Sequence, residues 1–192
     1  MRQLDIPFVV VETGHAGEQY PSHLEAGEIA VYLAEHKSDS YLEPLASNQI
    51  LLTADTVVWH RGRELGKPRG EEEAIAMLSM LSGTTHHVYT GVCLRSSYAA
   101  RRSFCSSTRV TFSNLEQAEI EYYVNRYKPF DKAGAYGIQE WIGYTAVERI
   151  EGSYFNVIGL PVQKVYSELK QFIAGTNRSE NNHPGTDKQN GP

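Results

Sequence analysis

An apolar run interrupted by a single acid most constrains how this chain can fold. The run spans residues 50–59, reads ILLTADTVVW, and is rich in the β-branched and apolar side chains that strands favour. A buried carboxylate is destabilising unless it is paired, because it loses its hydration. We therefore predict that Asp55 lies at the end of a strand and faces a cation or a substrate. The alternative is an ordinary hairpin in which the acid has no role.

The residues after this run predict a turn that carries a lysine. Gly62 stands between two arginines, as in a tight turn, and Gly66-Lys67-Pro68 follows soon after. The proline fixes the backbone there, while the ammonium group of Lys67 keeps its mobility. We predict that Lys67 contacts a phosphate group across from Asp55; in the alternative, the lysine is incidental.

Hydrophobic spacing along the chain predicts strands and helices that alternate. Helical spacing marks residues 25–41, 71–81, 113–127 and 162–173, and Ser113 with Glu116 fits a capping box at the start of the third helix. Besides the central run, residues 6–11, 85–94, 104–112 and 145–150 are predicted strands. These elements predict one α/β domain with a mixed sheet over residues 1–174, followed by a polar, disordered tail over residues 175–192.

Lys37 extends the apolar face of the first predicted helix by one turn. It follows Leu33 by four residues and Ala34 by three, so it continues the inward stripe. A lysine at such a position either bends outward to solvent or reaches into a site beyond the end of the helix.

Composition excludes several classes of protein. The net charge of −5 argues against broad binding of nucleic acid or of anionic membranes. The sequence has no apolar run of the roughly 18 residues that a membrane span needs, and its N-terminus does not read as a signal peptide, so we expect a cytoplasmic protein. His86 and His87 would point to opposite faces of a strand and cannot chelate a metal together. A polyanionic ligand must therefore be held by a few lysines or arginines and a metal ion.

Residues 129–143, PFDKAGAYGIQEWIG, form a segment too rich in glycine for a helix and too rich in aromatic residues for a linker. Gly134 and Gly137 would let the backbone approach a ligand closely, and Asp131 and Lys132 add polar groups. Gln139 can both donate and accept hydrogen bonds, as the recognition of a base edge requires. The alternative is a structural Ω-type loop in which the glutamine caps the backbone.

Taken together, the strings LLTADTVV, GKP, LSGTTHHVYTGV, DKAGAYGIQ and IEGSYFNVIGLPV resemble the Maf family of nucleotide pyrophosphatases, relatives in fold of the inosine triphosphate pyrophosphatases. The resemblance extends from about Ile6 to Leu169. It implies a long, mixed, highly curved sheet with a nucleotide in a cleft between two lobes. ADT together with DKAGAYGIQ resembles the branch of the family that acts on dTTP and UTP.

The resemblance implies hydrolysis of a nucleoside triphosphate between its α and β phosphates, with Mg or Mn as a divalent cofactor and a homodimer as the suggested assembly. Asp55 matches the proton acceptor that activates water. The other matched positions are Thr56 and Gln139 for base choice, Lys37 and Lys67 for the triphosphate, and Glu18 for the metal beside Asp55. The loop around Glu18 reads Gly17-Glu18-Gln19 where the family has Asp-Glu-Thr, so its first acid is replaced.

Family members open with a strand and a Ser-x-Ser-Pro-Arg-Arg turn whose amides and arginines cradle phosphate. The sequence opens at Met1-Arg2-Gln3-Leu4, which resembles the end of the helix after that turn. We expect the first strand to be missing and catalysis to be weak or absent, which leaves a catalytically impaired nucleotide-binding relative as the alternative. An aspartyl phosphatase fits less well, because its second acid would stand where this chain has Val57.

Overall fold

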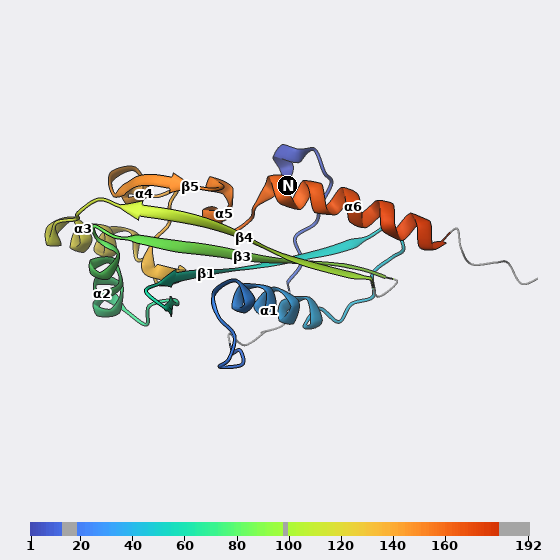
Figure 1. Ribbon diagram of the computed structural model, residues 1–192, viewed down its shortest axis with the longest axis horizontal. Helices are drawn as coiled ribbons and strands as arrows, with labels where there is room; N and C mark the ends of the chain where they lie inside the picture. The colour runs from blue at the N-terminus through green and yellow to red at the C-terminus, as the bar shows by residue number, and fades with distance from the viewer. Residues whose placement is uncertain (13–18, 98–99, 181–192) are drawn as a thin grey trace, which may run out of the picture.

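A five-stranded sheet organises the computed structural model, which describes residues 1–12, 19–97 and 100–180. The strands are β1 (Ile50–His60), β2 (Arg63–Leu65), β3 (Thr85–Ser96), β4 (Arg101–Phe112) and β5 (Val147–Glu151), in the order β2-β1-β3-β4-β5. Figure 1 shows β1, β3 and β4 as long strands that twist across one another. The predicted α/β class is confirmed. The predicted mixed sheet is corrected, because every pair among the described strands is antiparallel.

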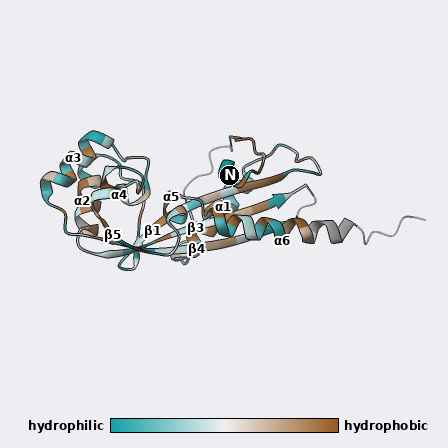
Figure 2. Cartoon of the chain, turned by 90° about the horizontal axis from the view of Figure 1, so that it is seen from above, coloured by the Kyte–Doolittle hydropathy of each residue, from teal (hydrophilic) through white to brown (hydrophobic). Residues whose placement is uncertain are grey.

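Helices cover the two ends of the long strands. At one end lie α2 (Glu71–Leu81), α3 (Gln117–Tyr127) and α4 (Trp141–Thr145) (Figure 2), and η2 (Ala133–Ala135) contacts α2 there; we call these four helices the α2 lobe. Toward the other end, α1 (Ala26–Asp39) and α6 (Val162–Glu180) lie on opposite faces of the sheet and form the α1 lobe (Figure 1). The remaining helices are η1 (Arg2–Leu4) and α5 (Tyr154–Ile158). None of the helices in the described part of the chain is both long and apolar enough to cross a membrane.

The centre of β3 is buried on both of its faces. Residues 90–94 are all buried, which breaks the alternation expected of a strand with one wet face. The cause is that α1 packs on one face of β3 while α5 and α6 contact the strand as well. Gly91 sits at the closest approach, since a Cβ atom there would lie 2.2 Å from the backbone carbonyl of Ala30 in α1. The absence of a side chain at Gly91 thus sets the distance between helix and sheet.

A two-residue turn joins β1 to β2, as the sequence predicts at Gly62. Arg61 and Gly62 have φ angles of 49° and 80°, and His60 pairs with Arg63. Such left-handed pairs match the right-handed twist of a hairpin. The turn directs the chain into Gly66 and Lys67. The hydroxyl of Tyr20 donates a hydrogen bond to the carboxylate of Glu64 in β2, which ties the segment before α1 to this hairpin.

Three predicted elements differ from the structure. Residues 6–11 form no strand; Val9 and Val10 are 84% and 82% exposed, because no described strand pairs with them and β propensity alone does not create a ladder. The cap of α3 is Glu116 with Glu119, not Ser113, whose backbone N–H donates to the carbonyl of Ala146 instead. Helix α6 continues to Glu180, beyond its predicted end at residue 173 and through residues 175–180 of the predicted tail. Residues 181–192 lie outside the described residues.

His86 is a buried core residue. Its Nε2 atom lies 2.8 Å from the hydroxyl of Tyr136, and its ring packs edge-on against Phe112. Burial, together with the nearby His60 and His87, lowers the pKa of His86 to about 3. The half-exposed His87 lies on the opposite face, as predicted.

This burial predicts acid sensitivity. Below about pH 6.5 the unfolded chain protonates His86 while the folded chain does not, so the contribution of His86 to stability is complete above that pH and is lost toward pH 3. The expected slope is about 1.4 kcal/mol per pH unit. His86→Gln, which cannot take up the proton, should remove this slope in denaturant unfolding measured from pH 7 to pH 4.5. Parallel pH profiles for the two proteins would contradict the assignment.

Candidate active site

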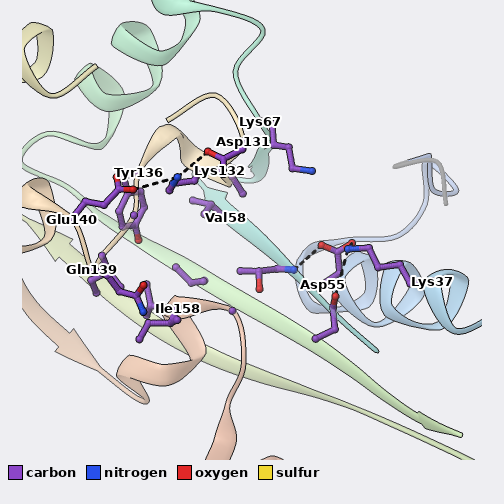
Figure 3. A pocket seen from close by; sticks show the side chains of 18 residues that line it. Lys37, Asp55, Val58, Lys67, Asp131, Lys132, Tyr136, Gln139, Glu140 and Ile158 are labelled. Atoms are coloured by element: carbon purple, nitrogen blue, oxygen red, sulfur yellow. Dashed lines mark hydrogen bonds and ion pairs between the residues drawn. The ribbon is translucent and has the colours of Figure 1, made fainter. Parts of the chain in front are cut away.

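A cleft of about 360 Å³ runs along β1 from the end of α1 to the loop that contains η2 (Figure 3). Five of the six predicted site residues line it: Lys37, Asp55, Thr56, Lys67 and Gln139. The sixth, Glu18, lies outside the described residues. The cleft is thus formed by segments that are far apart in the sequence and that the fold brings together.

Asp55 and Lys37 form an ion pair on the wall of the cleft. The Nζ atom of Lys37, in the last turn of α1, lies 2.9 Å from Oδ2 of Asp55. The backbone N–H of Thr56 donates to Oδ1 of Asp55 at 2.8 Å. The side chains of Lys37 and Asp55 are 35% and 18% exposed, so both remain within reach of a ligand.

The prediction that Asp55 faces a cation is confirmed, whereas its predicted place at a strand end is wrong. Asp55 lies in the middle of β1, with Gly91 of β3 beside it. β2 pairs only with residues 58–60 of β1, so the edge of β1 near Asp55 is open to Lys37, whose Nζ atom also donates to the carbonyl of Ala54 at 3.5 Å. Lys37 therefore reaches into the site instead of bending out to solvent.

Lys67 approaches the same cleft from the turn after β2. The carbonyl of Gly66 accepts a hydrogen bond from the N–H of Gly134 at 3.1 Å, which fixes the turn against η2. Gly134 has a φ of 69° and packs on the side chain of Val58, so a larger residue would not fit there. Figure 3 shows Lys67 beside Asp131 and Lys132 at one side of the cleft.

A third lysine, Lys132, completes the charged side of the cleft; the sequence indicated it only as a polar group of the glycine-rich segment, without a specific role. Its Nζ atom lies 2.8 Å from Oδ1 of Asp131 and 3.3 Å from Oε1 of Glu140. Burial disfavours the charge on Lys132, but the hydrogen bonds to the two carboxylates outweigh it and raise the pKa of the lysine. The hydrogen bond from Lys132 in turn lowers the pKa of Asp131. Lys132 is thus a fixed cation in the cleft.

Tyr123 of α3 supports this cluster from behind. Its hydroxyl donates to the carboxylate of Glu140 and accepts the N–H of Gly137 at 3.0 Å. Burial and the hydrogen bond to Glu140 raise the pKa of Tyr123, so the hydroxyl stays protonated. The sequence signal for Lys132 and Glu140 was their place in the string that also carries Gln139, although nothing in that string reveals which polar groups meet.

The opposite side of the cleft is mostly apolar. Gln139 lies there beside Ile158, and the amide side chain faces the cleft (Figure 3). Apolar side chains of β1, β3, the η2 loop and α5 also line the cleft: Val58, Val88, Ile138, Val157 and Ile158. An apolar surface with a few convergent polar groups is typical of small-molecule sites. The cleft therefore offers cations for an anionic group at one side and apolar side chains with an amide at the other.

The residues of the cleft fit a divalent cation that shares its ligands with a phosphate. In the described residues, no group of three or more His, Cys, Asp or Glu side chains could hold a metal ion by itself. Mg²⁺ usually binds through one or two carboxylates and completes its shell with water and substrate phosphate oxygens. The exposed part of the Asp55 carboxylate suits that arrangement.

Comparison with known proteins shows the family to which this chain belongs. The family model described as Maf-like protein matches residues 1–172. A Phocaeicola vulgatus protein named dTTP/UTP pyrophosphatase is 53% identical over 169 residues, which are 88% of this chain and 87% of that protein. Proteins of the same name from Bacteroides fragilis and Porphyromonas gingivalis are 48% identical over 172 residues (90% of this chain, 89% of theirs) and 49% identical over 171 residues (88% and 85%). The resemblance seen in the motifs is confirmed, and the chain belongs to the Maf family.

Proposed function

We propose that this chain is a nucleoside triphosphate pyrophosphatase that hydrolyses dTTP and UTP to the monophosphate and pyrophosphate. The observation that carries the proposal is the single cleft that joins Asp55, three lysines and Gln139. The names of its relatives support dTTP and UTP as the substrates. An α/β enzyme of this kind needs a cationic side for the triphosphate and a separate surface for the base, and the cleft has both.

The charged side of the cleft suits the triphosphate. A triphosphate carries about four negative charges, and ammonium groups stabilise the further charge that develops as a phosphate ester bond breaks. Lys37, Lys67 and Lys132 would contact the phosphate oxygens, with Lys132 held in place by Asp131 and Glu140. Because each lysine comes from a different element, together they select an extended polyphosphate over a single phosphate group.

Asp55 is the residue that would accept a proton from water. In the proposed step, the oxygen of water bonds to one phosphorus of the α–β linkage, and its proton passes to the carboxylate of Asp55. The bridging oxygen then leaves with the other phosphate. The hydrogen bond from the N–H of Thr56 and the ion pair with Lys37 orient the carboxylate in the cleft.

Asp55 would also contribute to holding a divalent cation, Mg or Mn, together with the phosphate oxygens. Such a cation, when bound, neutralises phosphate charge and polarises the bond that breaks. The sequence-based roles of Glu18 at the metal and of a homodimer remain predictions. We place the activity in the cytoplasm, where nucleoside triphosphates are used.

The test is release of pyrophosphate from dTTP, UTP, CTP and GTP, each with magnesium or manganese. Release from dTTP and UTP in preference to the other two supports the proposal. A chain that binds dTTP and UTP without releasing pyrophosphate would instead be the catalytically impaired relative, and equal turnover of all four nucleotides would contradict the proposed substrate class.

Gln139→Ala should reduce selectivity among bases more than it reduces the rate on the best substrate. The amide lies at the apolar side of the cleft, away from Asp55, and a hydrogen bond to a neutral group contributes about 0.5–1.5 kcal/mol. The ratio of kcat/KM for UTP over CTP should therefore fall by roughly 2- to 10-fold. A profile identical to that of the wild type would make Gln139 a structural residue. Gln117→Ala, on the exposed surface of α3, is the matched control.

A further inference from the structure

A pair of threonines crosses the sheet at the edge of the cleft. Thr56 of β1 and Thr90 of β3 stand directly opposite each other, and their hydroxyl oxygens lie 2.9 Å apart. Thr56 is partly exposed and lines the cleft, whereas Thr90 is completely buried behind it. From distance alone, either hydroxyl of the pair could be the donor.

The buried partner of Thr90 decides the direction. A hydroxyl carries one proton, and a carbonyl oxygen can only accept. Thr90 lies 2.9 Å from the backbone carbonyl of Asn156, so its proton goes there. If Thr90 donated to Thr56 instead, its oxygen would face the buried carbonyl oxygen with no proton between them. The hydroxyl of Thr56 must therefore donate to Thr90.

The carbonyl that sets this direction is itself fixed. The side-chain Nδ2 of Asn156 donates to the carbonyl of Val88 at 2.9 Å and to the hydroxyl of Thr108 at 3.0 Å. The N–H of Gly159 also donates to the Asn156 carbonyl, at 3.0 Å. Asn156 is fully buried, so water does not compete for these groups. The hydrogen bonds thus run in one direction, from the cleft to a rigid acceptor in α5.

With its proton committed inward, the oxygen of Thr56 can offer only lone pairs to a ligand in the cleft. Gly159 leaves room for such a ligand, because its φ of 111° favours glycine and a Cβ atom there would lie 3.5 Å from the Thr56 hydroxyl oxygen. Thr56 is thus a hydrogen-bond acceptor on the wall of the cleft next to Gly159, which follows α5, and Gln139 lies beside Ile158 of that helix (Figure 3).

We propose that Thr90 is a positioning residue for base selection: it holds the Thr56 hydroxyl as an acceptor for the N3–H group shared by uracil and thymine. This inference rests on the proposed function. Cytosine has an unprotonated N3, so an acceptor would face an acceptor and the pair would be left unsatisfied. Such a mismatch lowers binding by about ten- to a hundred-fold. Uracil and thymine differ only at C5, which explains how one site could take both.

The first test compares kcat/KM for UTP and CTP in the wild type, Thr90→Val and Thr90→Ser. Valine has a similar shape but offers no acceptor, so the Thr56 hydroxyl becomes free to donate to cytosine. The UTP-to-CTP ratio should fall by about tenfold in Thr90→Val, mainly through faster turnover of CTP. Thr90→Ser keeps a hydroxyl and should retain the wild-type ratio. Equal losses on both substrates in Thr90→Val would overturn the inference, since a purely structural role has that effect.

The second test uses the wild-type protein and so does not depend on how the variants fold. In 3-deazauridine triphosphate a C–H group replaces N3–H without added bulk. Its kcat/KM should be at least about tenfold below that of UTP. Turnover equal to that of UTP would overturn the inference. If the wild type hydrolysed neither dTTP nor UTP, the proposed function would fail; if it hydrolysed both but accepted the deaza analogue equally well, only the role of Thr90 and Thr56 would fail.

Discussion

Replacing Asp55 by asparagine should lower the rate of pyrophosphate release from dTTP and UTP by about 10²- to 10⁴-fold, the range usual for a lost general base. Asparagine keeps the shape of the side chain but cannot accept the proton of water. The three lysines remain in the cleft, so nucleotide should still bind. Pyrophosphate release gives the rate, and calorimetry with a non-hydrolysable dTTP analogue gives the binding.

Asp39→Asn is the matched control for this experiment. Like Asp55, Asp39 pairs with a cation, in this case Arg101, but Asp39 is the last residue of α1 and is not among the residues that line the cleft. The same chemical change should leave the rate within a few-fold of the wild type. Turnover by Asp55→Asn close to that of the wild type would remove Asp55 from its proposed role, whatever the control does.

Gly91→Ala adds a single methyl group and should strongly lower the free energy of unfolding. The added carbon would lie 2.2 Å from the carbonyl carbon and oxygen of Ala30 and 2.4 Å from the nitrogen of Val31, which are backbone atoms that cannot rotate away. The helix must shift, at an expected cost of about 3 kcal/mol. The melting temperature should then fall by roughly 6–12 °C for a chain of this size. Because α1 carries Lys37, the shifted helix should also lose its ion pair with Asp55 and some activity.

The comparison variant is Gly66→Ala, where no atom lies within 4 Å of the added carbon. Its free energy of unfolding should stay within about 0.5 kcal/mol of the wild type. Thermal unfolding followed by circular dichroism measures both variants. A Gly91→Ala protein as stable as Gly66→Ala would mean that α1 and β3 are less tightly packed than described.

Local patterns in the sequence were enough to predict the elements that have both a strong period and a partner. Helix α2 has its predicted bounds, residues 71–81, because its acidic first turn and the glycine after its end act within a few residues. For the same reason, local patterns also predicted the strand that contains Asp55, the hairpin turn at Gly62 and the inward position of Lys37. The family motifs added the expectation that Lys67 and Gln139 meet at one cleft.

What the sequence could not supply depends on contacts between distant segments. The hydrogen bond between Thr56 and Thr90 depends on the register of β1 against β3. The ion pair between Glu140 and Lys132 depends on Tyr123 of α3, which donates a hydrogen bond to Glu140. Residues 6–11 show the reverse case: their composition favours a strand, but composition cannot tell whether a neighbouring strand is present. The polar composition after residue 174 likewise gave no sign that α6 continues.

The long strands of the sheet also restrict how the site can move. Strands β1, β3 and β4 run without a break from the α1 lobe into the α2 lobe, hydrogen-bonded to one another along the way (Figure 1). Enzymes that enclose a substrate by swinging two bodies about a linker need a few residues free to change their backbone angles. Here such a swing would require three paired strands to bend as one. The paired strands therefore fix the distance between the Lys37 end and the Gln139 end of the cleft before a nucleotide binds. A nucleotide must fit that fixed distance.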